Sequence, residues 1–201
     1  VVRAANRLKA RVRFNTVEGF KVNGPHWRFD GLDVVGTCPV DSDCEHAFHV
    51  SGRALGFQLL RSRVVDFNAQ LKVNANAAGD GGFDVPHQGL IEGNELFDTH
   101  ARMTSNPTTK LNIDTGDDWV VRGNFIHDFH KGAGDNVSYG VFLKSGGKRG
   151  LVERNLVVCT YDLATGGTRL GLSFGGGGTA PQFCAPAFSA AVPCSVEHSD
   201  G

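Results

Sequence analysis

The amino-acid sequence predicts an all-β solenoid, in which short strands stack in successive coils of about 30 residues. The first observation is a repeat: four segments align without gaps and begin at Leu60, Ile91, Val121 and Val152, separated by 31, 30 and 31 positions. The second is that 27 of the 201 residues are glycine, nearly twice the usual share of about 7%, which favours many tight turns. The third is that no stretch shows convincing helical periodicity with caps, apart from a short helix expected at residues 1–8.

The repeat segments predict short strands that face a core. A fifth copy covers residues 29–35, which begins 31 positions before Leu60. Each copy starts with an apolar residue, continues with a polar one and has a small or bent middle before a second apolar position. Asn94, Asn124 and Asn155 occupy one column of this alignment. Stacked asparagines at the bends of successive coils can hydrogen-bond to one another as a ladder, whereas the alternative is three independent turn residues.

A second column of strands is predicted by alternation of apolar with polar or exposable residues. Its members are residues 48–51, 71–74, 111–114, 141–144 and 172–174. A strand with this pattern buries one face and exposes the other. Two or three strands in each coil of about 30 residues complete the solenoid.

The repeats Gly-Leu-Ile-Glu-Gly-Asn at residues 89–94, Trp-Val-Val-Arg-Gly-Asn at 119–124 and Gly-Leu-Val-Glu-Arg-Asn at 150–155 resemble those of a right-handed parallel β-helix of the pectate-lyase-like group. The resemblance covers residues 29–174 and implies an all-β parallel β-helix. Helices of this kind host lyases, hydrolases, isomerases and non-catalytic adhesins, so the resemblance alone selects no activity.

Length and charge favour one domain over residues 1–201, with its repeat core at 29–174. The last residues resemble a stretch that leads into a repeat strand, so we expect either a truncated chain or a coil capped by residues 184–194 or by a partner. With 20 Lys and Arg against 21 Asp and Glu, the formal net charge is −1, which argues against nucleic-acid capture. No apolar run approaches the roughly 18 residues of a membrane-spanning helix. The sequence predicts no particular oligomeric state.

Five cysteines suggest two local disulfides. Cys38 and Cys44 are six positions apart, Cys184 and Cys194 are ten apart, and Cys159 stands alone. Disulfides of this kind persist in oxidising compartments, so a secreted or periplasmic protein is expected, with reduced buried cysteines as the alternative.

Neither cysteine pair has the spacing of a structural zinc site. His46 and His49 near Cys44 are therefore interpreted as loop residues. His127 and His130 are expected on opposite faces of a strand, where they would not bind one metal ion together.

Chemistry is expected on the outward face of the second column, because rungs about 4.8 Å apart can line a groove for an extended polymer. The outward residues by this pattern are His49, Ser51, Lys72, Asn74, Lys110, Asn112, Asp114, Phe142, Lys144 and Ser173. Insertions at residues 75–85 and 129–139 would rise beside this groove.

In uronate lyases of the group that the sequence resembles, Ca²⁺ or another cation neutralises the uronate carboxylate and a Lys or Arg removes the proton next to it. The resemblance therefore implies β-elimination of an acidic polysaccharide. The catalytic residues would be Lys72, Lys144 and Asp114, and His49, Asn74, Asn112 and Phe142 would bind substrate. Asp114, Asp117 and Asp118 would supply hard oxygen ligands for Ca²⁺.

Three alternatives stay open. The lysines and Asp114 also fit a surface ladder of opposite charges without catalysis. Asp117 and Asp118 resemble the paired aspartates of β-helix polygalacturonases, but no companion signature follows them, so a turn is favoured over a glycoside hydrolase. The third is a non-catalytic carbohydrate-binding or surface scaffold.

Overall fold

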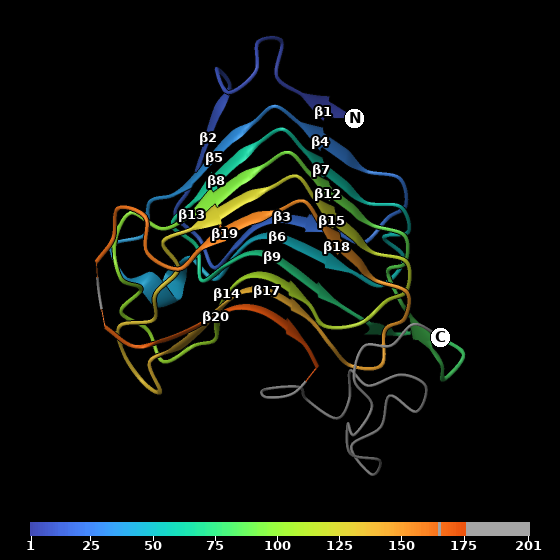
Figure 1. The fold of residues 1–201 in the computed structure, drawn as a ribbon. Coiled ribbons are helices and arrows are strands. Elements are labelled where there is room, and N and C mark those ends of the chain that lie inside the picture. Colours follow the sequence, from blue (N-terminus) through green and yellow to red (C-terminus); the bar gives the residue numbers. More distant parts are fainter. Residues whose placement is uncertain (165, 176–201) are drawn as a thin grey trace.

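The chain forms a parallel β-helix of about six turns. The computed structural model describes residues 1–164 and 166–175, and its strands assemble into three parallel six-stranded sheets (Figure 1). Sheet 1 consists of β1 (Val2–Arg3), β4 (Arg28–Asp30), β7 (Gln58–Leu60), β12 (Leu90–Glu92), β15 (Val120–Arg122) and β18 (Leu151–Glu153). Sheet 2 consists of β2 (Arg11–Phe14), β5 (Asp33–Gly36), β8 (Arg63–Val65), β13 (Glu95–Phe97), β16 (Phe125–His127) and β19 (Leu156–Val158). Sheet 3 consists of β3 (Glu18–Val22), β6 (His46–Ser51), β9 (Ala69–Asn74), β14 (Thr108–Ile113), β17 (Val137–Leu143) and β20 (Thr168–Phe174).

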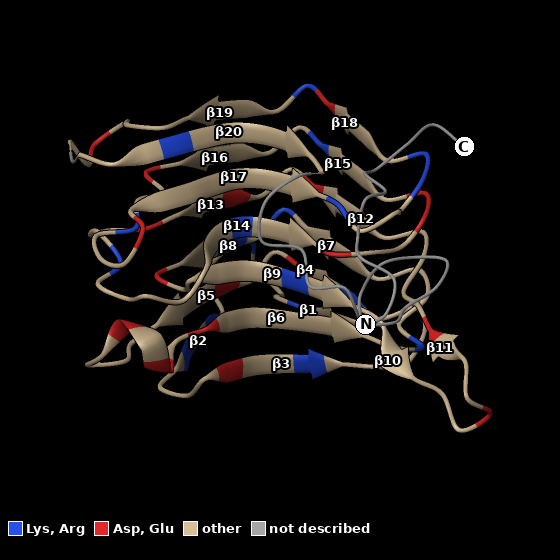
Figure 2. Ribbon diagram, turned by 90° about the horizontal axis from the view of Figure 1, so that it is seen from below, with Lys and Arg blue, Asp and Glu red and all other residues tan. Residues whose placement is uncertain are grey.

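The predicted all-β solenoid is confirmed, and its strands follow one another in the order expected of coils. Each turn contributes one strand to each sheet, and every strand pairs in parallel with the equivalent strand of the next turn. Figure 2 looks onto sheet 3, whose strands succeed one another from β3 to β20. No helix among the described residues has the length and apolarity to cross a membrane.

The core consists of columns of apolar side chains that stack from turn to turn. One column from each sheet illustrates the packing: Phe29, Leu59, Ile91 and Val121 in sheet 1, Val34, Val64, Leu96 and Ile126 in sheet 2, and Val50, Val73, Ile113 and Leu143 in sheet 3. All of these side chains are buried. Burial of apolar area in every coil therefore stabilises the stack, together with the hydrogen bonds between paired strands of successive turns.

The repeat predicted to begin at Leu60 begins one residue earlier in the structure, at Leu59. The strand partner of Ile91 is Leu59 rather than Leu60, although Phe29, Val121 and Val152 keep their predicted columns. This shift places Ser62 in the asparagine column. The Asn94 side-chain oxygen accepts a hydrogen bond from the Ser62 backbone N–H at 2.9 Å.

The predicted asparagine ladder is present at the corner between sheets 1 and 2. The side-chain nitrogen of Asn94 donates to the side-chain oxygen of Asn124 at 3.0 Å, and Asn124 donates in the same way to Asn155 at 2.9 Å. Gly93 and Gly123 precede two of these asparagines with φ of 66° and 62°, the left-handed conformation that turns the chain. The ladder satisfies backbone groups that the sharp corner takes out of the sheets.

The first turn differs from the prediction. A short helix was expected at residues 1–8, but residues 2–3 form β1, which pairs with β4. Leu8 has a left-handed φ of 59°, which interrupts any helix there. The number of residues between equivalent positions of turns 1 and 2 also differs from that between later turns, so the repeat pattern in the sequence does not extend to turn 1.

Cys38 and Cys44 form the predicted disulfide, with 5.7 Å between their Cα atoms, and a short 3₁₀ helix, η1 (Asp41–Asp43), lies inside the loop. Cys159 is half-buried and forms no disulfide with another described residue. Cys184 and Cys194 lie outside the described residues.

Candidate functional site

The outward face of sheet 3 is shaped by a local irregularity in its strands. A regular strand alternates sides at every residue, but in β14 both Lys110 and Leu111 are fully buried. Residues three positions apart therefore share the outer face. In β17, the Tyr139 and Phe142 rings stack there with their centroids 4.5 Å apart.

This irregularity corrects one expectation. Lys110 was expected to point outward, but its side chain is wholly buried and its Nζ contacts the buried Asp98 carboxylate at 2.5 Å. The carbonyl oxygen of Phe67 accepts a second hydrogen bond from this Nζ at 2.9 Å. Lys110 thus belongs to the interior and not to the candidate site.

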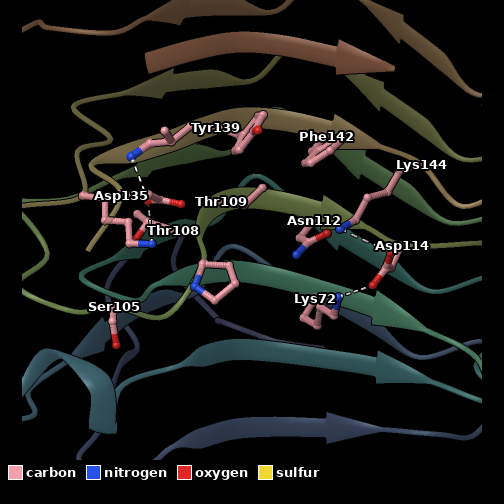
Figure 3. A pocket seen from close by; sticks show the side chains of 13 residues that line it. Lys72, Ser105, Thr108, Thr109, Asn112, Asp114, Asp135, Tyr139, Phe142 and Lys144 are labelled. Atoms are coloured by element: carbon pink, nitrogen blue, oxygen red, sulfur yellow. Dashed lines mark hydrogen bonds and ion pairs between the residues drawn. The ribbon is translucent and has the colours of Figure 1, made fainter. Parts of the chain in front are cut away.

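A pocket of about 440 Å³ lies on this outer face and spans strands β9, β14 and β17 (Figure 3). It is lined by Lys72, Ser105, Pro107, Thr108, Thr109, Asn112, Asp114, Lys131, Asp135, Val137, Tyr139, Phe142 and Lys144. Five of the predicted site residues are among them. Among the described residues, the lining contains three lysines against two aspartates, so this part of the pocket carries an excess positive charge when all of these groups are ionised.

Lys72, Asp114 and Lys144 come together at one end of the pocket. The Nζ of Lys72 lies 2.6 Å from one carboxylate oxygen of Asp114, and the Nζ of Lys144 lies 3.4 Å from the other. Figure 3 shows the two lysines reaching Asp114 from the neighbouring rungs. The Ser145 hydroxyl donates to Asp114 at 2.6 Å, which fixes the carboxylate further.

The two lysines differ in their surroundings. Burial lowers the pKa of the Lys144 ammonium, and the charge of Lys72 lowers it further, although Asp114 opposes both effects. The Lys144 side chain is 4% exposed, whereas that of Lys72 is 14% exposed. Burial is thus the main cause that favours loss of the proton from Lys144.

The Phe142 ring completes this end of the pocket. The Nζ of Lys144 lies 4.7 Å from the centroid of the Phe142 ring. Phe142 is only 2% exposed, so the half-buried Tyr139 ring, stacked on it, is the aromatic surface against which the apolar face of a sugar ring can pack.

Two buried polar atoms of the pocket have no hydrogen-bond partner within the described part of the chain. They are the side-chain oxygen of Asn112 and the hydroxyl of Thr108, in residues that are 7% and 1% exposed. Buried polar atoms are normally paired, so these two are positions where a ligand can supply the missing partner.

The insertion at residues 129–139 forms the other end of the pocket, as predicted. The Nζ of Lys131 lies 2.8 Å from a carboxylate oxygen of Asp135, and both residues line the pocket. The insertion at residues 75–85 forms a hairpin of β10 (Asn76–Ala77) and β11 (Phe83–Asp84), and none of its residues lines this pocket.

His49 and Asn74 were predicted to bind substrate, but they do not line the pocket. The Nε2 of His49 lies 2.7 Å from the side-chain oxygen of Asn74, and the Nδ1 of His49 faces Glu18. Both belong to the part of sheet 3 nearer the N-terminus, and His46 and His49 lie in β6 rather than in the loop expected for them.

The three aspartates predicted to hold Ca²⁺ are not brought together. Asp117 and Asp118 form ion pairs with Arg149 at 3.2 and 2.8 Å, whereas Asp114 is held by the lysines. Across residues 1–164 and 166–175, the structure does not gather these three carboxylates into one ligand group. Asp118 has a φ of 60°, in keeping with its interpretation as a turn residue.

Several pocket residues were missed by the sequence reasoning. Tyr139 and Thr109 lie three positions before Phe142 and Asn112, and strict alternation assigns such a residue to the opposite face. Lys131 and Asp135 lie in an insertion without a periodic pattern. The sequence does contain one sign of this arrangement, since Tyr139 precedes the aromatic Phe142 by three positions.

Comparison of the chain with family models, curated proteins and solved structures finds no match.

Proposed function

We propose that the pocket on sheet 3 binds an acidic, uronate-containing polysaccharide and cleaves it by β-elimination, as the resemblance to pectate-lyase-like proteins also suggests. The observation that carries the proposal is the buried Lys144, whose ammonium shares the single carboxylate of Asp114 with Lys72. A lysine with a lowered pKa is suited to act as a general base near neutral pH.

Each group has a role in this proposal. Lys144 removes the proton on the carbon next to the uronate carboxylate, and the ammonium of Lys72 attracts that carboxylate and stabilises the charge that develops on it. Asp114 positions both lysines. Asn112 and Thr108 hydrogen-bond to sugar hydroxyls, and the half-buried Tyr139 ring, which stacks on Phe142, supports a sugar ring.

The reaction balances without an oxidant or added water. The electron pair of the broken C5–H bond forms the C4=C5 double bond, and the C4–O glycosidic bond breaks. The leaving oxygen takes a proton from the Lys144 ammonium or from solvent. Ca²⁺ bound by the substrate carboxylate is the alternative source of positive charge.

The second candidate is carbohydrate binding without cleavage. It is favoured by the close contacts of Asp114 with Lys72 and Ser145, at 2.6 Å each, which hold the cluster as a fixed array of charges. Either activity fits a secreted or periplasmic protein, and the Cys38–Cys44 disulfide supports such a location.

The test is incubation of the full chain with pectate, alginate and chondroitin while ultraviolet absorbance of unsaturated uronate is recorded, with added Ca²⁺ or with chelator. Lys144→Met should abolish the signal and Lys72→Met should weaken binding of the polymer, whereas Lys148→Met, at an exposed lysine outside the pocket, is the matched control. Retention of polymer without a new chromophore would favour the binding function. Neither retention nor cleavage by the folded chain would contradict both.

A further inference from the structure

A second cluster of reactive side chains lies on sheet 3, towards the N-terminal turns. The Nδ1 atoms of His46 and His49 lie 3.0 and 3.1 Å from the same carboxylate oxygen of Glu18. Among the described residues, this is the one group of three or more His, Cys, Asp and Glu side chains whose candidate ligand atoms all lie within 4.8 Å of one another.

Strand pairing and the irregularity of sheet 3 explain why these residues meet. Glu18 of β3 is the register partner of His46 of β6. Ala47 and Phe48 are both fully buried, so His49 returns to the same outer face as His46. The two imidazole rings lie side by side with centroids 4.9 Å apart.

The surroundings of His49 determine which of its ring nitrogens is available. The side-chain nitrogen of Asn74 donates to the carbonyl oxygen of Ala75 at 3.0 Å, which turns the Asn74 oxygen towards His49. That oxygen lies 2.7 Å from the Nε2 of His49, so Nε2 is the donor. The Nδ1 of His49 faces Glu18, so it donates to the carboxylate while the ring is protonated, and its lone pair becomes available to a metal ion when that proton leaves.

His46 has a comparable outer neighbour. Its Nε2 lies 4.0 Å from a carboxylate oxygen of Glu45, whose other oxygen accepts hydrogen bonds from the side chains of Asn68 and Asn106 at 2.7 and 2.8 Å. A hydrogen-bond partner behind the second ring nitrogen is the usual environment of histidines that bind metal ions, and His49 has this partner in Asn74. Glu45 faces the Nε2 of His46 but lies beyond hydrogen-bond distance of it.

We propose that Glu18, His46 and His49 form a site for a divalent transition-metal ion, with Zn²⁺ the best match. Ligands about 2.0–2.1 Å from Zn²⁺ in a tetrahedron lie roughly 3.3 Å from one another, close to the separations observed between the carboxylate and both Nδ1 atoms. Two imidazoles and one carboxylate favour Zn²⁺ over Ca²⁺ or Mg²⁺, which prefer oxygen ligands.

The site is open on one side. The side chains of Glu18, His46 and His49 are 19%, 16% and 24% exposed, which leaves room for a water molecule or an anion as a fourth ligand. The bound ion would also join β3 to β6 and so fasten turn 1 to turn 2. This inference does not depend on the proposed sugar chemistry, because none of the three residues lines the pocket.

The test is calorimetric titration of the metal-free full chain with Zn²⁺, with Ca²⁺ and Mg²⁺ as comparison ions. We expect one Zn²⁺ per chain and no comparable binding of the other two. We expect Zn²⁺ binding to weaken at least tenfold in each of the variants His46→Ala, His49→Ala and Glu18→Gln. His26→Asn is the control, because His26 is exposed and lies outside the cluster, and it should leave Zn²⁺ binding unchanged. Unchanged affinity in the His46→Ala and His49→Ala variants would overturn the proposal.

A second measurement on the unaltered chain avoids the risk that a variant misfolds. Nitrogen-15 spectra of the imidazole side chains distinguish the two ring nitrogens, and the geometry requires that Zn²⁺ shift the Nδ1 signals of His46 and His49. Shifts at Nε2, or no change in either ring on addition of Zn²⁺, would overturn the assignment whatever the variants do.

Discussion

Removal of the central rung of the asparagine ladder should destabilise the β-helix strongly. Within the described part of the chain, the buried Asn124 side chain takes part in four hydrogen bonds. Two are accepted from Asn94, and two are donated to the Ile91 carbonyl and to Asn155. At about 1 kcal/mol for each bond, Asn124→Ala should lower the free energy of unfolding by about 4 kcal/mol.

The half-buried end of the ladder gives a graded comparison. The side chain of Asn155 makes three hydrogen bonds, but solvent can replace part of them, so Asn155→Ala should cost about 1–2 kcal/mol. Asn15→Ala, at an exposed position, should change stability by less than about 0.5 kcal/mol. Denaturant unfolding followed by circular dichroism measures all three variants. If Asn124→Ala costs no more than Asn15→Ala, the ladder does not stabilise the corner as described.

Three further predictions concern backbone strain, acid and buried charge. Arg154 has a left-handed φ of 54°, so Arg154→Gly should raise the free energy of unfolding by about 0.5–1 kcal/mol, and a lower melting temperature would contradict strain at this corner. Burial opposes ionisation of Glu18, but two neighbouring histidines lower its pKa from 4.5 to about 2, so its stabilising contribution is present above about pH 4.5 and is lost as the pH falls towards 2. In Glu18→Gln, the free energy of unfolding should therefore fall less steeply with decreasing pH below about pH 4.5. An unchanged dependence on pH would argue against the contribution of Glu18. Lys110→Met leaves the buried Asp98 without the lysine of its ion pair and should lower the free energy of unfolding by about 3–5 kcal/mol. Adding Asp98→Asn should restore part of that loss, and thermal unfolding measures both variants.

The fold was predictable because its stabilising contacts repeat at a nearly constant interval. The asparagine column and the apolar positions on either side of it mark one corner in each turn, and sheet 3 shows the predicted register from Phe48 through Leu71 and Leu111 to Val141. Prediction failed where the interval changed. The first turn has its own spacing, and Ser62 replaces asparagine in the column, so one repeat was misplaced by one residue.

The candidate site was only partly predictable, because it depends on departures from regular strand geometry. Lys72, Asp114 and Lys144 follow the simple alternation and were identified together. Tyr139 and His46 reach the outer face only because two consecutive residues after each of them turn away from it. Glu18 is distant from the histidines in sequence, and only the pairing of β3 with β6 brings it beside them.

The most direct test of cleavage at the sheet 3 pocket is mass spectrometry of oligosaccharides released from a uronate polymer in water labelled with heavy oxygen. β-Elimination predicts unsaturated uronate at the new non-reducing ends and no label incorporated by bond cleavage, with product formation lost in Lys144→Met and kept in Lys148→Met. Products that gain one labelled oxygen at each cleaved bond would show hydrolysis and contradict the proposed reaction. Equal product formation by Lys144→Met would contradict the assignment of Lys144 as the base.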